Sequence, residues 1–291
     1  MFQRIHFLFA VIILILPGCK PKPIDIAIPQ QPETITISSV ALNDHTIAVA
    51  AGYSVNSLAN LEDSLQNENR QSIPKGMLLD SAIVTISENG QIPYTLTQVS
   101  TGVYGSRDIK LREGVQYTLS VIDQKKNIAV TSSTCFVPKP QLDKVYPELI
   151  RNSSDTITKL HVHLKDVKAG EHYFMFYNTA RNTRAYFMGS DMSMASLQAF
   201  EPKHLELFTP GTGGQIEKVF TLSVKPDDTL NVTIGRIDDS YYKYLEAYKR
   251  TGYLINQITG EPINLPTNIN NGFGCFSLYV PERRLFNLRD Y

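Results

Sequence analysis

The chain has 291 residues, and its 28 Lys and Arg residues balance 28 Asp and Glu residues, so the formal net charge is zero. Without a basic surplus there is no electrostatic reason to expect a nucleic-acid partner. Hydrophobic residues make up 42% of the chain, which is normal for a folded globular protein. This length suits one large domain or two medium domains.

The first residues predict an exported precursor. Arg4 supplies positive charge, and an unbroken apolar run follows from Phe7 to Leu16. That run is shorter than the roughly 20 residues that span a bilayer and has the length of a signal-peptide core. Leu16-Pro17-Gly18-Cys19 then resembles a bacterial lipobox, which implies lipidation of Cys19 after removal of a signal peptide, residues 1–18. An ordinary secretory peptide with a chance cysteine is the alternative.

The segment after this cysteine, residues 19–33, is predicted to be a tether. Its prolines favour an extended backbone and resist helix formation. The lipid on Cys19 would include palmitate-like acyl chains, and each buried methylene contributes about 0.8 kcal/mol to membrane binding. Several chains therefore hold a protein durably, and the expected first partner is the lipid bilayer.

Short alternating segments predict that residues 34–137 form a β-sandwich of immunoglobulin or transthyretin type. Apolar and polar residues alternate at period two in residues 34–38, 82–86 and 117–121. Pro93 lies inside a predicted return strand, and proline within a sheet is largely confined to edges, so this strand is expected at a sheet edge.

Residues 138–291 are predicted to form a second β-rich domain. Pro138 and Pro140 stiffen the boundary before it. The apolar and aromatic segment Tyr173–Tyr177 predicts a strand that is buried on both faces. One helix is expected near residues 240–251, where Tyr241, Tyr244, Leu245 and Tyr248 share one face, with N-cap oxygens before it and Gly252 as the C-cap.

One histidine pair in the sequence has metal-ligand spacing. His161 and His163 are two residues apart, so on a strand both side chains point to the same face. His172 follows as a conceivable third ligand. Lys165 shares the predicted face, and its positive charge favours a solvated polar face over a metal site. No metal and no cofactor is therefore predicted, and these histidines stay weak candidates.

Two cysteines besides Cys19 remain. Cys135 and Cys275 could form a disulfide outside the cytoplasm, or both could be small core residues. The sequence contains no GxSxG or HExxH motif and no arrangement that singles out a catalytic triad. Gly211–Gly214 lacks the Lys-Ser/Thr of a phosphate loop and is expected to be a flexible hairpin. No catalytic residue is assigned, and the prediction is that the chain is not an enzyme.

Two C-terminal segments carry a resemblance to a known family. Residues 237–248, Ile-Asp-Asp-Ser-Tyr-Tyr-Lys-Tyr-Leu-Glu-Ala-Tyr, and residues 266–276, Pro-Thr-Asn-Ile-Asn-Asn-Gly-Phe-Gly-Cys-Phe, resemble motifs of a Bacteroidetes outer-membrane lipoprotein family known as domain of unknown function 4249. Val84-Thr85-Ile86 and Thr101–Tyr104 are similar to its sandwich hairpin. The resemblance implies a lipid-anchored protein of the outer membrane, often encoded near TonB-dependent receptors. It implies no agreed activity and no site residues.

The leading functional hypothesis is therefore a non-catalytic outer-membrane lipoprotein of the cell envelope that serves as an accessory or ligand-binding partner of a TonB-dependent receptor. A fimbrial or adhesin subunit is one alternative, although no arginine lies between Cys19 and Arg70 for the maturation cleavage that such subunits need. A glycan- or peptide-acting enzyme is the other alternative. Whether the anchored protein faces the periplasm or the cell surface stays open.

Overall fold

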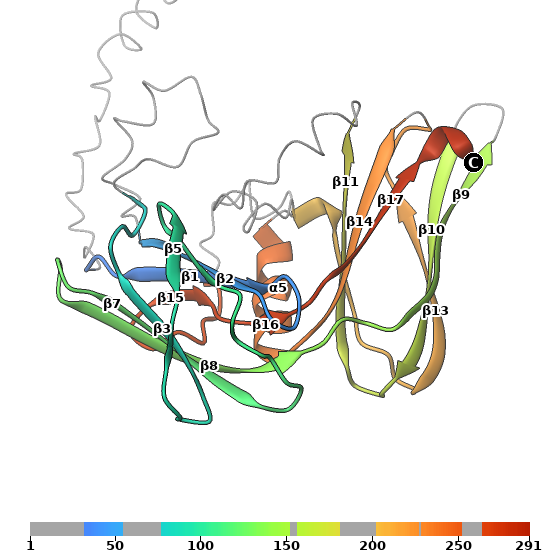
Figure 1. Ribbon diagram of the computed structural model, residues 1–291. Coiled ribbons are helices and arrows are strands. Elements are labelled where there is room, and N and C mark those ends of the chain that lie inside the picture. The colour runs from blue at the N-terminus through green and yellow to red at the C-terminus, as the bar shows by residue number, and fades with distance from the viewer. Residues whose placement is uncertain (1–31, 55–76, 152–155, 181–201, 227, 252–263) are drawn as a thin grey trace, which may run out of the picture. The chain divides into compact units, whose positions relative to one another are not determined.

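The computed structural model describes residues 32–54, 77–151, 156–180, 202–226, 228–251 and 264–291 (Figure 1). Glu33–Tyr291 forms one compact unit, distinct from Met1–Pro32. The predicted signal peptide, the Cys19 lipidation site and nearly all of the predicted tether lie outside the described residues. The described part is mostly β-structure with a single α-helix among its residues, which confirms the predicted fold class.

Two five-stranded sheets form the first sandwich. One sheet has the strand order β15 (Phe273–Cys275), β1 (Ile35–Ala41), β2 (Ile47–Tyr53), β6 (Val103–Ser106) and β5 (Thr97–Ser100). The other has the order β16 (Leu278–Tyr279), β8 (Ile128–Val137), β7 (Gln116–Asp123), β3 (Ile83–Glu88) and β4 (Tyr94–Thr95). The predicted alternation places Ile35, Ile37, Val84, Ile86 and Leu119 in one shared core.

Pro93 precedes β4 instead of lying inside a strand, but the strand that follows it is an edge strand, as predicted. β4 is the outermost strand of its sheet and pairs only with β3 among the described strands. After Leu96, which is buried, the chain crosses to the opposite sheet and continues as β5, the edge of that sheet. Residues 94–100 therefore form neighbouring edges of both sheets.

Two smaller sheets form the second sandwich (Figure 1). The three-stranded sheet has the order β13 (Gly214–Leu222), β10 (Thr156–Val167) and β9 (Leu142–Arg151). The four-stranded sheet has the order β12 (Leu205–Phe208), β11 (His172–Ala180), β14 (Thr229–Ile237) and β17 (Glu282–Asn287), and the short 3-10 helices η2 (Pro202–His204) and η3 (Leu288–Asp290) flank these strands. Side chains from both sheets fill the core between them.

The aromatic segment of β11 is buried on both faces, which confirms the prediction from its sequence. Tyr173, Met175 and Tyr177 belong to the core of the second sandwich. Phe174 and Phe176 point the other way, into a separate cluster that includes Val40 and Ala48 of the first sandwich and α5 (Asp239–Thr251). One strand therefore contributes to two cores because its second face is covered by other elements instead of by water.

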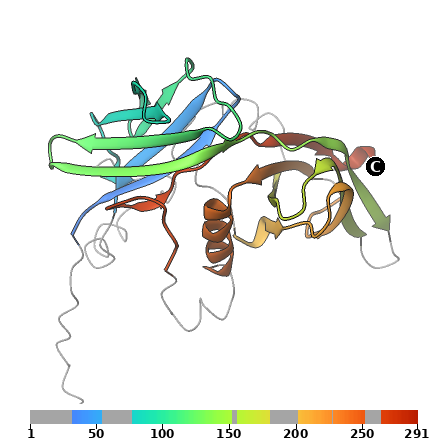
Figure 2. The same ribbon diagram turned by 90° about the horizontal axis from the view of Figure 1, so that it is seen from below.

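The predicted helix is present as α5, the coiled ribbon of Figure 2. Asp238 caps its N-terminus, since the backbone N–H of Tyr241 donates to the Asp238 Oδ1 atom at 2.9 Å. Tyr241 and Leu245 are its buried residues, and they pack against Phe174 and Tyr279. The predicted C-cap, Gly252, lies outside the described residues.

The chain returns to the first sandwich near its C-terminus. β15 pairs in parallel with β1, and β16 pairs in parallel with β8. Ile269, Phe276 and Leu278 lie in the core of the first sandwich. The predicted domain limit assigned all of residues 138–291 to the second β-rich domain, whereas residues 269–279 complete the first one. Local periodicity carries no information on such distant pairings.

Candidate functional site

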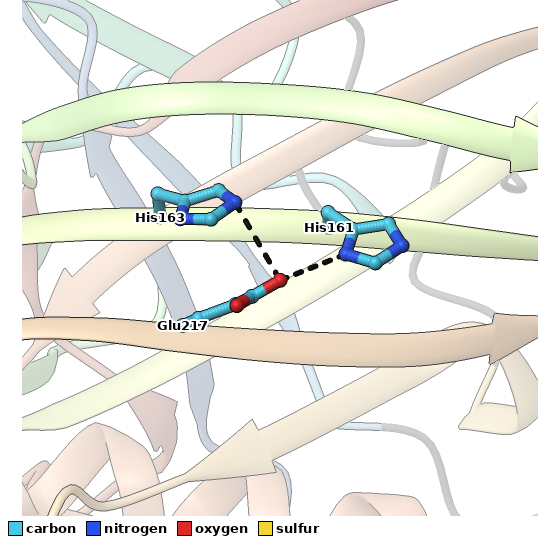
Figure 3. A group of neighbouring side chains, drawn as sticks. All are labelled: His161, His163 and Glu217. Atoms are coloured by element: carbon cyan, nitrogen blue, oxygen red, sulfur yellow. Dashed lines mark hydrogen bonds and ion pairs between the residues drawn. The ribbon is translucent and has the colours of Figure 1, made fainter.

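His161 and His163 lie on the outer face of β10, as their spacing predicts, and Glu217 of the neighbouring strand β13 joins them (Figure 3). Glu217 is paired in register with His163. One ligand-type atom from each of the three side chains lies within 4.8 Å of the other two. Sheet pairing therefore builds a two-histidine, one-carboxylate group that the sequence shows only in part.

His161 lies between two carboxylates. Its Nδ1 atom is 2.8 Å from Glu217 Oε1, and its Nε2 atom is 2.9 Å from Glu148 Oε2 on β9. The side chain is only 16% exposed. The hydrogen bonds to Glu217 and Glu148 stabilise the charged imidazolium, so the pKa of His161 is raised above its ordinary value. The pKa of Glu217 is lowered, chiefly by its hydrogen bond with His161.

His163 has a different environment. Its Nε2 atom is 3.6 Å from the same Oε1 atom of Glu217, too far for a hydrogen bond, and it is shielded from solvent without any hydrogen-bond partner. Tyr146 of β9 stacks on both rings, with centroid distances of 4.8 Å to His161 and 5.8 Å to His163. The tyrosine therefore limits how far either imidazole can rotate.

His172, the third candidate ligand, is not brought to this group. It lies on β11 in the opposite sheet, where its Nδ1 atom is 2.7 Å from Thr209 Oγ1 and its ring stacks on Tyr242. Glu217 is the third member of the group, in the place that was considered for His172. Glu217 and Glu148 were missed because they come from other strands, and sequence spacing does not show which strands pair.

The charge of Lys165, which weighed against a metal site, is neutralised locally. Its Nζ atom is 2.5 Å from Asp143 Oδ1 on β9. This exposed ion pair holds the ammonium group beside its own carboxylate. Lys165 therefore adds less positive potential to the histidine group than the sequence suggests.

Cys135 and Cys275, the candidate disulfide pair, are separate free thiols in this structure. Cys135 is exposed on β8 and Cys275 is buried on β15. Cys275 packs in the cluster beside α5, and burial raises the pKa of its thiol, with a smaller contribution from the charge of Asp238. The side chains lie in different environments, so Cys275 is a core residue and Cys135 a surface residue.

The hollows on the described surface include one beside His161 and one on the first sandwich. One, of about 390 Å³, adjoins His161 and is lined by Tyr146, Pro147, Glu148, Leu149, His161 and Tyr291. The other, of about 670 Å³, lies on the first sandwich beside the edge strand β5, where Thr97, Val99 and Arg107 contribute to its lining. Both fall in the size range of small-ligand sites.

The C-terminal motif segment has a structural role. Asn268 makes two reciprocal bonds with Phe276: its Nδ2 group donates to the Phe276 carbonyl oxygen at 2.8 Å, and the Phe276 N–H donates to Asn268 Oδ1 at 2.9 Å. The backbone N–H of Asn270 donates to the carbonyl oxygen of Thr131 on β8 at 2.8 Å. Gly274 has φ of +93°, a conformation that disfavours side-chain-bearing residues. The segment attaches the C-terminal strands to the first sandwich.

No helix in the described part of the chain is long and apolar enough to cross a membrane. No curated protein matches the chain. Among solved structures, a segment of two fibronectin type III domains from chicken tenascin is similar with 13% identity and a TM-score of 0.22, covering 71% of this chain and 91% of that chain. The family model described as "Domain of unknown function (DUF4249)" matches residues 22–284, so the chain belongs to this family.

Proposed function

We propose that this protein is a lipid-anchored, non-catalytic component of the cell envelope that acts as an accessory or ligand-binding partner of a TonB-dependent transport system in the outer membrane. The observation that carries the proposal is the order of segments along the chain. An apolar run ends at Leu16 just before Gly18-Cys19, a proline-rich segment follows, and a compact body begins at Glu33. This order suits a folded body held at a membrane by lipid.

Cys275 and Tyr279 are not candidates for a catalytic nucleophile. Burial raises the pKa of the Cys275 thiol and raises the pKa of Tyr279 to about 12. A catalytic nucleophile is usually activated by a lowered pKa or by an adjacent base. These shifts favour the protonated, unreactive forms, and both side chains pack in the cluster around α5.

The edge of the first sandwich supports partner binding. Ile92 is 88% exposed and Val99 is 53% exposed, and Tyr94 between them is also exposed. Tyr94 and Val99 lie on the edge strands β4 and β5 of the two sheets, and Ile92 lies just before β4. Exposed apolar side chains beside unpaired strand edges are typical of protein-binding surfaces. We assign this edge surface, Ile92, Tyr94 and Val99, as the contact surface for the envelope partner.

Cell fractionation tests the anchor. Wild-type protein is expected in the outer-membrane fraction, and Cys19→Ala is expected either in the soluble fraction or as uncleaved precursor. Cys135→Ala is the matched control because Cys135 is an exposed cysteine in the folded body. Wild-type membrane levels of Cys19→Ala would overturn the anchoring part of the proposal.

Copurification in mild detergent tests the partner. Wild-type protein is expected to bring down a TonB-dependent receptor, and the double variant Ile92→Ser, Val99→Ser is expected to lose it. Leu285→Ser is the control, since Leu285 is 45% exposed on β17 of the second sandwich. Absence of any receptor from the wild-type sample, or equal loss in the control, would contradict the accessory role.

A further inference from the structure

We propose that His161, His163 and Glu217 form a binding site for a divalent transition-metal ion of the zinc class. The inference goes beyond the proposed accessory function and does not depend on it. Two imidazoles and one carboxylate are a donor set that Zn²⁺ uses, and three protein ligands leave a coordination position open for water or another ligand. These are the only three such side chains grouped together in the described residues.

The two distances from Glu217 to the histidine nitrogens lie close to those expected around one ion, and all three ligand atoms lie within 4.8 Å of one another. Ligand atoms in a tetrahedral zinc site lie about 3.3 Å apart, because each is about 2.0 to 2.1 Å from the metal. Here Glu217 Oε1 is 2.8 Å from His161 Nδ1 and 3.6 Å from His163 Nε2. Figure 3 shows both imidazole rings directed at this carboxylate oxygen. An ion would replace the hydrogen-bonded proton between His161 and Glu217.

The unpaired nitrogen of His163 is an independent observation that points to a ligand. Its Nε2 atom is shielded from solvent and has no hydrogen-bond partner. A buried polar atom without a partner is destabilising, and such atoms in folded proteins call for an explanation. A metal ion bound to this nitrogen would give it the partner that it lacks, since the atom already faces the Glu217 carboxylate.

The groups around the three ligands resemble an outer coordination shell. The Nε2 atom of His161 is 2.9 Å from Glu148 Oε2, an arrangement in which a carboxylate holds the far ring nitrogen of a metal-binding histidine. This contact fixes the tautomer that leaves Nδ1 directed at Glu217. Tyr146 stacks on both rings and limits their rotation. The three paired strands β9, β10 and β13 therefore position the site.

Zinc titration of the purified full-length protein in mild detergent, without a polyhistidine tag, tests the site. Calorimetry is expected to show one Zn²⁺ ion per chain, and Mg²⁺ or Ca²⁺ is expected not to compete, since both prefer all-oxygen ligands. The single variants His163→Gln and Glu217→Gln are each expected to weaken binding at least about 100-fold, and Glu148→Gln about 10-fold.

Matched controls separate this site from other histidines. His172→Gln and His45→Gln are expected to bind Zn²⁺ like the wild type, because neither side chain contacts the site. Circular dichroism shows whether each variant is folded. A crystal soaked with Zn²⁺ is expected to give anomalous density between His161 Nδ1, His163 Nε2 and Glu217.

Two results would overturn the proposal: no zinc binding by the folded wild-type protein, or unchanged affinity in folded His163→Gln and Glu217→Gln. The Cys19→Ala full-length chain is expected to bind Zn²⁺ with unchanged affinity. A failure of membrane anchoring or receptor copurification therefore leaves this test intact, and a failure of zinc binding leaves the proposed accessory function intact.

Discussion

Ser39 and Ser277 exchange two hydrogen bonds in the interior, although 238 residues separate them. The Ser39 Oγ–H group donates to the Ser277 carbonyl oxygen at 2.8 Å, and the Ser277 N–H group donates back to Ser39 Oγ at 2.9 Å. Ser277 Oγ donates in turn to Asp238 Oδ2, the carboxylate that caps α5, at 2.7 Å. A series of hydrogen bonds through Ser277 therefore connects β1 to the N-terminus of α5.

Ser39→Ala is expected to lower the free energy of unfolding by about 1 to 3 kcal/mol, since it leaves the buried N–H and carbonyl groups of Ser277 unpaired. Chemical denaturation measures the loss. Ser133→Ala is the control, because Ser133 makes a comparable hydroxyl contact with Thr118 on the exposed face. Its expected effect is within about 0.5 kcal/mol. Equal losses in the two variants would show that the buried Ser39–Ser277 bonds stabilise the fold no more than an exposed hydroxyl contact does.

Gly274→Ala is expected to disrupt the pairing of β15 with β1. Gly274 has φ of +93°, and a Cβ atom there would collide with the carbonyl oxygen of Ile37. Gly90→Ala is the control, because Gly90 has φ of +74° with no atom within 4 Å of an added Cβ. The control isolates the backbone term of about 1 to 2 kcal/mol. Thermal unfolding is expected to show a larger loss for Gly274→Ala; equal losses would exclude the collision as a cause.

Much of the local structure follows from the sequence because it depends on neighbouring residues. Period-two alternation predicts β10 with both histidines on one face, and caps and tyrosine spacing predict α5. Pro93 predicts an edge strand because proline lacks the N–H that a ladder requires. Each of these features is specified within a few residues.

The features that could not be predicted depend on pairings between distant strands. Phe276 lies between the short strands β15 and β16, and nothing in the local sequence indicates that this segment completes the first sandwich. Similarly, Glu217 meets His163 only because β13 lies beside β10 in this register. A shift by one residue would turn Glu217 to the opposite face. The sequence therefore predicts the two histidines of the candidate site but not its carboxylate.

Glu171 is expected to make the stability of the protein depend on acid pH. Burial opposes its ionisation, but hydrogen bonds from the Lys168 N–H and the Tyr173 hydroxyl, together with Arg236, outweigh burial, so the pKa of Glu171 lies below its usual 4.5. The ionised form is favoured in the folded state. Its stabilisation is fully present above pH 4.5 and is lost as the pH falls through the lower, folded-state pKa.

Glu171→Gln is expected to lower the melting temperature at pH 7 and to flatten the decline of melting temperature with acidification below the usual pKa of 4.5. Arg236 contacts Glu171 through Nη1 and Glu113 through Nη2, each at 2.6 Å. Glu113→Gln is therefore the control: it removes the more exposed carboxylate from the same arginine. If the melting temperature of Glu171→Gln falls with acidification as steeply as that of the wild type, Glu171 is not the source of the acid dependence.

Asp238 is expected to stabilise α5 through its cap and through its contact with Ser277. Asp238→Ala removes both and is expected to lower the free energy of unfolding by about 1 to 3 kcal/mol. Asp238→Asn keeps a side-chain oxygen for the Tyr241 N–H group and is expected to recover most of the cap. Hydrogen exchange of the first-turn amides of α5 measures the effect locally.

Asp239→Ala is the matched control for the helix terminus. Asp239 is exposed and pairs with Lys243 one turn along α5, at 2.6 Å between Nζ and Oδ2. Exposed pairs of this kind contribute little, so its exchange rates are expected to stay near those of the wild type. If both alanine variants accelerate exchange equally, negative charge at the helix terminus would explain the stability of α5. Acceleration in Asp238→Ala alone, with recovery in Asp238→Asn, assigns it to the hydrogen bond that the Asp238 side chain accepts from the Tyr241 N–H group.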